Sequence, residues 1–309
     1  MEYISISTKY EKYQSLSSSR VLLVPYSKHH VPQYNEWMKD PEIQQATASE
    51  PLTLEEEYAM QTTWRTDADK LTYIVCLPLD KSLSSSSSSL PAGGVTGAST
   101  TDVNASQPTA FLPTVTLTDP NIDTPASMLG DVNLFLRLDR EAEEEEEDDD
   151  DDGHRTADDG GARVVGEIEL MIAEKGKQGK GFGRAGLLCF LKYIADHEVE
   201  ILGGFVSSLS SSSASASASG TGTGAAGDDG KGKGETAIGK KLAYLSAKIG
   251  ANNVRSLALF QSLGFVKVSE KPNVFGEVEL RRGGLGGDEG EELLRKYGVE
   301  EYREVGYER

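Results

Sequence analysis

A glycine-rich turn between an extended segment and an apolar helical segment constrains this chain more than any other feature. Residues 164–173 are rich in Val, Ile and Leu, as expected of a strand. Residues 176–183 then carry four glycines, and residues 187–195 place apolar side chains at helical spacing. The backbone N–H groups of such a turn, together with the partial positive charge at the start of a helix, make an anion site. The sequence therefore predicts that a phosphate-bearing ligand binds at this turn.

Low-complexity segments reduce the folded part of the 309-residue chain to one domain. Three of them are predicted to be disordered insertions, because they have too few apolar side chains to offset the entropy of ordering. They are the Ser/Thr/Pro-rich residues 78–127, the acidic residues 139–163 and the Ser/Ala/Gly-rich residues 207–238. Residues 1–19 are interpreted as a polar leader and residues 283–309 as a charged tail. The interrupted range 20–282 then has the size of a single domain.

The rest of the chain carries strand and helix patterns in turn. Helices are expected over residues 30–40, after Thr53 with its capping-box pattern, after Asn253 as N-cap, and near residues 291–297. Gly264 suits the left-handed position that ends a helix. Residues 198–206 are expected to be irregular or extended. Strands are predicted at residues 20–26, 71–77, 129–138, 164–173, 241–249, 265–269 and 275–282.

The net charge of −19 comes mostly from one segment and argues against a nucleic-acid surface. Residues 141–152 hold eleven acids in twelve positions, and no basic stripe follows elsewhere. This run is interpreted as a solvated loop, with attraction of basic partners as the alternative. No apolar run approaches the roughly 18–20 residues that a membrane span needs. The expected partners therefore include neither nucleic acid nor membrane.

Cysteine and histidine usage favours a reducing compartment and no metal centre. Cys76 and Cys189 each lie in an apolar run and are predicted to be buried thiols without a zinc spacing. The four histidines form no H-x-x-x-H pattern. We expect a cytoplasmic protein that binds no metal.

Three ligands compete for the glycine turn. A mononucleotide P-loop is disfavoured because Lys-Ser/Thr does not follow the glycines. Residues 181–186 match the dinucleotide pattern G-x-G-x-x-G, but the turn lies in mid-domain and a lone match is weak. The third interpretation reads residues 178–183 as Gln/Arg-x-x-Gly-x-Gly/Ala, with a second motif some 70 residues later at residues 253–265.

These two motifs in this order resemble the central motifs of the Gcn5-related N-acetyltransferase superfamily. Within it, the sequence most resembles the N-acetyltransferase 9 branch, through residues 20–64, 166–173 and 248–265. The resemblance implies an α/β (α+β) fold with flanking helices and a mixed, mostly antiparallel sheet. It also implies one splayed parallel strand pair, formed by residues 164–173 and 241–249.

The resemblance further implies acetyl-CoA as co-substrate, with its pyrophosphate at the turn and its pantetheine arm between the splayed strands. The implied cofactor-binding residues are Met171, Ile172, Gln178, Gly179, Lys180, Gly181, Phe182, Gly183, Arg184, Asn253 and Ser256. Simpler interpretations remain open at some of them: Asn253 as an N-cap only, Ser256 as a solvent hydroxyl, and the glycines as a tight turn without a ligand.

Direct attack of a substrate amine on the thioester, which the family implies, requires a base. Glu167 and Glu169 share one strand face, and Glu169, nearer the turn, is the first candidate, with solvated or ion-paired carboxylates as the alternative. A freed N–H at Met171 or Ile172 is the candidate for holding the thioester oxygen. Phe260 stands where many members carry the acidic Tyr, so Ser256, Tyr244, a water or no acid at all are the alternatives for the proton donor.

The sequence thus predicts an N-acetyltransferase that acts on a protein or peptide amine, with an α-amino terminus as the favoured acceptor. The alternative is a non-catalytic binding protein with the same fold that acts through a partner such as the cytoskeleton. The acceptor specificity is not encoded in any motif.

Overall fold

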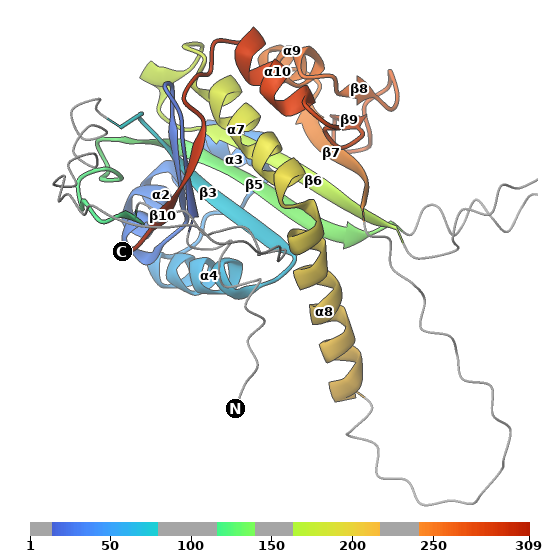
Figure 1. Cartoon of the computed structure of the whole chain (residues 1–309), viewed down its shortest axis with the longest axis horizontal. Coiled ribbons are helices and arrows are strands. Elements are labelled where there is room, and N and C mark those ends of the chain that lie inside the picture. Colours follow the sequence, from blue (N-terminus) through green and yellow to red (C-terminus); the bar gives the residue numbers. More distant parts are fainter. Residues whose placement is uncertain (1–13, 80–115, 140–162, 217–240) are drawn as a thin grey trace, which may run out of the picture.

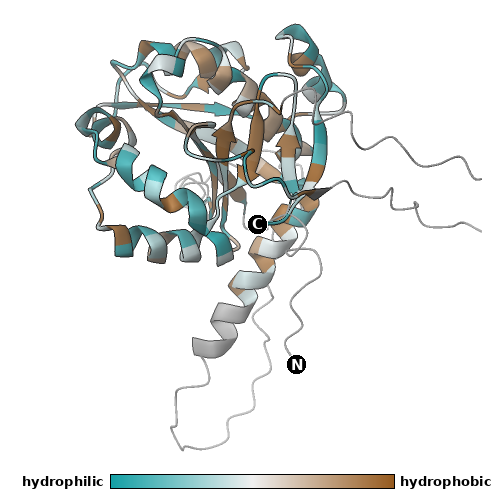
Figure 2. Cartoon of the chain, turned by 90° about the vertical axis from the view of Figure 1, so that its left-hand side faces the viewer, coloured by the Kyte–Doolittle hydropathy of each residue, from teal (hydrophilic) through white to brown (hydrophobic). Residues whose placement is uncertain are grey.

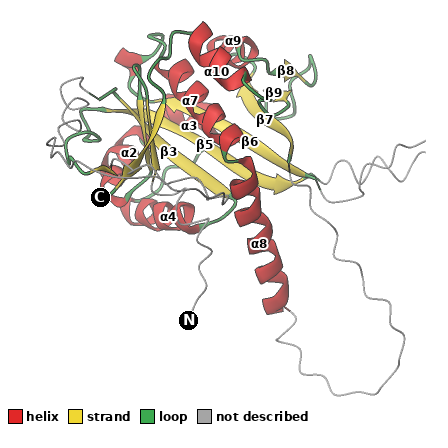
Figure 3. Cartoon of the chain, in the orientation of Figure 1, coloured by secondary structure: helices red, strands yellow, loops and turns green. Residues whose placement is uncertain are grey.

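The computed structural model describes residues 14–79, 116–139, 163–216 and 241–309. The central parts of the three predicted insertions, residues 80–115, 140–162 and 217–240, lie outside the described residues, as do residues 1–13. The described residues form a mixed sheet with helices on both faces (Figures 1 and 3). Among these residues, no helix is both long and apolar enough to cross a membrane.

The strands of the described residues form one sheet in the order β4-β10-β1-β2-β3-β5-β6-β7-β9-β8. Neighbours pair antiparallel except β6 with β7 and β4 with β10, which are parallel. This confirms the expected mixed, mostly antiparallel sheet with a parallel pair. The strand bounds are β1 Gln14–Ser17, β2 Leu22–Pro25, β3 Lys70–Cys76, β4 Thr116–Leu117, β5 Met128–Leu138, β6 Val164–Ile172, β7 Leu242–Gly250, β8 Val266–Lys267, β9 Glu277–Arg282 and β10 Arg303–Tyr307.

Two sets of helices cover the two faces of the sheet. One face packs against α7 (Phe182–Asp196), the start of α8 (Glu198–Ala216), α9 (Val254–Ser262) and α10 (Glu289–Lys296). The other packs against α2 (Val31–Met38), α3 (Pro41–Thr47) and α4 (Leu54–Thr66). Short 3-10 turns, η1 (Lys28–His30) and η2 (Lys175–Lys177), lead into α2 and follow β6.

Side-chain alternation along the central strands divides the core between these faces. In β2, Leu23 joins the α7 side, whereas Leu22 and Val24 join the α2 side. Because both faces are covered, such strands are apolar at successive positions rather than at alternate ones. Figure 2 shows the resulting hydrophobic interior of the sheet and the more hydrophilic outer helices.

The parallel pair β6 and β7 separates before either strand ends. Their pairing runs from Val164 with Leu242 to Glu167 with Ser246, whereas β6 continues to Ile172 and β7 to Gly250. Beyond this point each strand pairs only on its other side, β6 with β5 and β7 with β9. The expected splayed pair is therefore present, and it opens at the carboxyl end of β6.

The predicted domain limits were wrong at both ends. Residues 14–17 of the supposed leader form β1, and residues 303–307 of the supposed tail form β10; the two strands pair with each other. Leu16, Val305 and Tyr307 are buried. Each strand is short and has few apolar residues, so its identity depends on pairing across the whole chain length, which local patterning does not record.

Two further predictions were also wrong, one for residues 198–206 together with the start of the third insertion, and one for the first insertion. Residues 198–206 form the first part of helix α8, which continues to Ala216 inside the supposed third insertion. In the supposed first insertion, β4 pairs with β10, and Asp123 is completely buried. Asp139 N–H donates to the Arg163 carbonyl at 2.7 Å, which joins the two ends of the acidic segment.

Candidate functional site

A cavity of about 690 Å³ opens where β6 and β7 have separated. Leu170 and Ile172 line it from the α7 side of the sheet, whereas Met171 and Ile43 belong to the α2 side. Residues from both faces line one cavity because the pairing of the two strands has ended. Its volume lies in the range of small-molecule sites, about 300–1,000 Å³.

The glycine turn supplies one wall of this cavity with backbone rather than side chains. Gly179 and Gly181 have φ values of 71° and 89°, which other residues adopt only with strain. Gly181 is the N-cap of α7 and provides no capping side chain, so the first N–H groups of the helix remain available to a ligand. A Cβ at Gly183 would lie 3.4 Å from Ile172 Cγ1, so the turn packs closely on β6.

Most of the predicted cofactor residues line this cavity, and two do not. The lining includes Met171, Ile172, Gln178, Gly179, Gly181, Gly183, Arg184, Asn253 and Ser256. Lys180 and Phe182 are absent from it. The Lys180 carbonyl instead accepts a 3.0 Å hydrogen bond from Arg20, and Phe182 packs on the core. Gln178 donates from Nε2 to the Ile172 carbonyl at 2.7 Å, which ties the turn to the strand.

The cavity also contains residues that the motifs did not predict. Lys175 and Arg255 add positive charge beside Arg184, and Leu170, Ala258 and Leu259 add apolar surface. Arg255 lies within the second motif and Lys175 lies three residues before the first, so their sequence positions were a usable signal. No motif in the sequence predicted the wall made by α3, which consists of Glu42, Ile43, Ala46 and Thr47.

Contacts between α2–α3 and η2 hold that wall in place. Lys175 Nζ lies 2.9 Å from Asp40 Oδ2 and 2.8 Å from Glu42 Oε2. These carboxylates raise the pKa of Lys175. Trp37 Nε1 donates to Glu174 Oε1 at 2.8 Å. The α3 side is therefore attached to the chain just before the glycine turn.

Helix α9 brings Asn253 and Ser256 to the cavity. Asn253 Oδ1 accepts from the Ser256 N–H at 3.2 Å, so Asn253 is a true N-cap and also a lining residue. Phe260 is buried and packs edge-on against Phe265, with 5.0 Å between the ring centroids. Tyr244 lies beneath the Arg281 guanidinium and does not line the cavity. Of Ser256 and Tyr244, the two hydroxyl candidates for the proton donor, Ser256 is the one that lines the cavity.

Glu167 and Glu169 lie on the α2 side of β6 and differ in their surroundings. Glu167 Oε2 forms an ion pair with Lys248 Nζ at 2.9 Å. Glu169 is opposite Asn133, two positions before Met171, a separation of about 6.6 Å along the strand. The protein around Glu169 desolvates its carboxylate, and Asp131, Glu167 and Glu277 repel its charge more than Lys248 attracts it. Although its side chain still reaches solvent, these effects raise the pKa of Glu169 to about 7.

Asp131 is the buried carboxylate whose charge raises the pKa of Glu169 most, after the effect of burial. It is opposite Met171 in the β5–β6 pair, and it accepts hydrogen bonds from Tyr34 Oη at 3.1 Å and Asn133 Nδ2 at 2.8 Å. Desolvation raises the pKa of Asp131 to about 6 despite these hydrogen bonds. Because this pKa is still below 7, the Asp131 carboxylate is mostly ionised at neutral pH. Its negative charge repels the carboxylate of Glu169 on the same face of the sheet.

Backbone alternation distinguishes the two candidates for the free N–H. Ala173 N–H donates to the carbonyl of Leu129 in β5. Since N–H directions alternate along a strand, Met171 N–H also points toward β5, and Ile172 N–H points to the opposite side. That side faces β7, where pairing has already ended. Ile172 is thus the residue whose N–H is directed at the opening.

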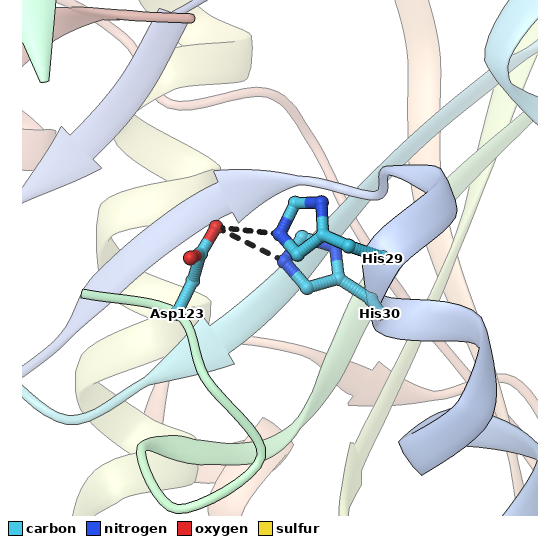
Figure 4. Close-up of side chains that lie close together, drawn as sticks. All are labelled: His29, His30 and Asp123. Atoms are coloured by element: carbon cyan, nitrogen blue, oxygen red, sulfur yellow. Dashed lines mark hydrogen bonds and ion pairs between the residues drawn. The ribbon is translucent and has the colours of Figure 1, made fainter. Parts of the chain in front are cut away.

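A second cluster, His29, His30 and Asp123 (Figure 4), has the composition of a metal site, and none of the three residues lines the cavity. Both histidine Nε2 atoms contact Asp123 Oδ2, at 3.0 and 3.1 Å. The Ser27 N–H donates to His30 Nδ1, so the proton of neutral His30 is on Nε2 and is donated to Asp123. A metal-binding histidine would instead use one nitrogen for the metal and donate from the other. This donor set fits a hydrogen-bond node better than a metal.

The node joins the C-terminus to the rest of the domain. Tyr307 and Arg309 also contact Asp123, whose carboxylate is completely buried. The donors around Asp123 hold its pKa well below the usual range against the effect of burial. Burial lowers the pKa of His30 to about 4, consistent with a neutral ring.

Sequence comparison identifies relatives of this chain over most of its length. The N-acetyltransferase 9-like protein of Schizosaccharomyces pombe is 31% identical over 269 residues, which cover 86% of this chain and 94% of the relative. The human protein named alpha/beta-tubulin-N-acetyltransferase 9 is 33% identical over 267 residues, covering 86% of this chain and 81% of the relative. No protein-family model matches the chain.

Solved structures align much more loosely. Spermidine N-acetyltransferase from Vibrio cholerae, in complex with CoA and spermine, aligns with a TM-score of 0.42 and 12% identity. The alignment covers 85% of this chain and 94% of that one. The assignment of this chain to a family therefore depends on the sequence relatives.

Proposed function

Because the chain belongs to the N-acetyltransferase 9 family, and is an N-acetyltransferase by that membership, we propose that it transfers acetyl from acetyl-CoA to a protein α-amine by direct attack on the thioester. The observation that carries this proposal is the cavity at the carboxyl end of β6, where β6 no longer pairs with β7 and the glycine turn supplies one wall. Leu170 and Ile172 then face the cofactor from one side of β6, and Glu169 lies on the other side, two positions before Met171.

The residues of the cavity suit the parts of acetyl-CoA. The Gly179–Gly181 backbone and the free start of α7 suit the pyrophosphate. Arg184 Nε is buried and has no hydrogen-bond acceptor within the described residues, as expected of a donor that awaits an anion. Leu170, Ile172 and Leu259 provide apolar surface for the pantetheine arm, with Asn253 and Ser256 as its polar partners.

Three groups of the chain would then divide the chemistry. Bound acetyl-CoA supplies the acetyl thioester. Glu169 accepts the proton of the acceptor ammonium, directly or through water, and its raised pKa suits a base near neutral pH. Ile172 N–H donates to the developing oxyanion. Ser256 is the candidate donor to the leaving thiolate, because Phe260 has no hydroxyl and is buried.

The names of two relatives support the proposed acceptor class. The human and Drosophila melanogaster relatives have names that specify α/β-tubulin as the acceptor. We extend this to a protein amine for the present chain, with a cytoskeletal protein as the candidate partner. A cytoplasmic location fits such a partner and the two buried free thiols, Cys76 and Cys189.

An acetylation assay tests the acceptor. The purified chain, acetyl-CoA and a synthetic peptide with a free N-terminus should give a product heavier by one acetyl group, which fragmentation mass spectrometry places on the α-nitrogen. A peptide with a blocked N-terminus and an internal Lys is the matched control. Acetylation of the Lys peptide alone would contradict the α-amine assignment.

The turn at Gly181 yields a second prediction. Gly181→Ala should raise the Kd for acetyl-CoA about tenfold, because a side chain at φ 89° costs about 1–2 kcal/mol and shifts the N–H groups of the cradle. Isothermal titration calorimetry measures this change.

Gly176→Ala is the matched control. It lies in the same turn, and a Cβ there would meet nothing within 4 Å. Equal effects of the two substitutions on the Kd would contradict the proposed role of the Gly181 backbone.

A further inference from the structure

The C-terminal helix α10 contacts both helices that begin at the cavity. Arg184, in the first turn of α7, stacks on the Tyr297 ring, with 4.7 Å between its guanidinium carbon and the ring centroid. Tyr297 Oη donates to the Ser262 carbonyl at the end of α9, at 2.7 Å. At the other end of α10, Glu289 pairs with Arg282 at 2.8 Å. Tyr297, at the C-terminal end of α10, thus links the start of α7, which lies at the cavity, to the end of α9.

Arg184 has few other means of keeping one orientation. Its side chain lines the cavity, and its Nε has no hydrogen-bond acceptor within the described residues. A guanidinium on a flexible stem loses rotamer entropy when it binds an anion, and stacking on an aromatic face restricts it beforehand. A partly buried ring at 4.7 Å is well within the distance at which this attraction acts.

We propose that Tyr297 is a positioning residue for acetyl-CoA: its ring holds the Arg184 guanidinium in the cavity wall, ready to bind the pyrophosphate. This inference rests on the proposed cofactor site. It assigns a role in binding to a segment whose charged sequence predicts only a tail.

Tyr297→Leu tests the proposal through two acetyl donors, with a peptide α-amine as acceptor. With acetyl-CoA, kcat/KM should fall about five- to tenfold, through KM, as expected for loss of one cation–π contact. With S-acetylpantetheine, which lacks the phosphates, kcat/KM should stay within about twofold. Equal losses with both donors would show that Tyr297 only supports the fold and would overturn the proposal, as would no loss with either.

Two matched variants separate the ring from its neighbours. Tyr297→Phe keeps the ring and loses only the hydrogen bond to Ser262, so it should bind acetyl-CoA like the wild type. Lys296 Nζ lies 5.2 Å from the same ring centroid but does not line the cavity, so Lys296→Gln should also have no effect. A loss in Tyr297→Phe equal to that in Tyr297→Leu would contradict a role for the ring.

A double-mutant cycle with Arg184 provides a further test. If Tyr297→Leu folds poorly, Tyr297→Met replaces it in this cycle. In an Arg184→Ala background, the second substitution should not change the KM for acetyl-CoA further, because Tyr297 acts through Arg184. Additive losses would overturn the proposal. If Arg184→Ala alone leaves that KM unchanged, the failure lies instead in the proposed cofactor site.

Discussion

Replacement of Glu169 by Gln is expected to lower kcat by about 10²- to 10⁴-fold, the usual contribution of a general base. The Kd for acetyl-CoA should not change, because Glu169 lies on the α2 side of β6 and does not line the cavity. Steady-state kinetics with a peptide acceptor and calorimetry with acetyl-CoA measure the two quantities separately. Loss of cofactor binding together with activity would indicate damage to the strand rather than removal of a base.

Glu167→Gln is the matched control for this substitution. Glu167 is on the same face two residues earlier, but Lys248 neutralises it at 2.9 Å. We expect at most a few-fold change in kcat. A large loss in Glu167→Gln with normal activity in Glu169→Gln would transfer the role of base to Glu167.

The pH profile provides an independent readout of the same base. Since the pKa of Glu169 is raised to about 7, kcat/KM should fall as the pH drops below about 7 and the carboxylate is protonated. Asp131, Glu167 and Glu277 raise this pKa, and Lys248 opposes them. Asp131→Asn removes one repelling charge, so the acidic limb of the profile should move to lower pH. An unchanged limb would mean that another group controls it.

Replacement of Asp123 by Asn is expected to destabilise the fold by about 3–5 kcal/mol, the typical cost of breaking a buried charge pair. The carboxylate is fully buried and accepts from His29 and His30, with Tyr307 and Arg309 as further contacts. The amide of Asn would turn an N–H₂ group toward donors that need an acceptor. Urea unfolding followed by circular dichroism gives the free energy of unfolding.

Asp69→Asn controls for a general effect of removing an ion-paired carboxylate. Asp69 pairs with Lys70 at 3.1 Å, and its side chain is 42% exposed, so the expected loss is about 1 kcal/mol or less. If Asp123→Asn cost no more than Asp69→Asn, the buried node would not be what holds β10 and the chain end against η1.

Several parts of the site were predictable because they depend on a few neighbouring residues. The strand, glycine turn and helix of residues 164–196 form where the pattern indicated, with positive φ at Gly179 and Gly181. Asn253 caps α9, and Gly264 has a φ of 85° just after that helix. The alternation that separates Glu169 from Leu170 and Ile172 was also readable, since the side-chain period of a strand is two.

Other parts of the site depend on contacts between distant segments. The pKa of Glu169 depends on Asp131, which comes from another strand, and the opposite wall of the cavity comes from α3. Helix α8 was missed because its Ser- and Gly-rich sequence resembles the low-complexity segment that follows it. The sequence shows that Phe260 has no hydroxyl to donate a proton, but only the structure shows that its ring lies in the core rather than at the site.

By itself, the sequence determined the local geometry of the anion turn, the helix caps and the two faces of β6, together with the family, because each is encoded by residues close together in the chain. Only the tertiary structure decided that residues 14–17 and 303–307 belong to the sheet, that Asp123 anchors β10, and that Tyr297 stacks on Arg184. The physical reason is that short strands and single side chains are stabilised by long-range pairing and burial, which leave little pattern in the segments themselves.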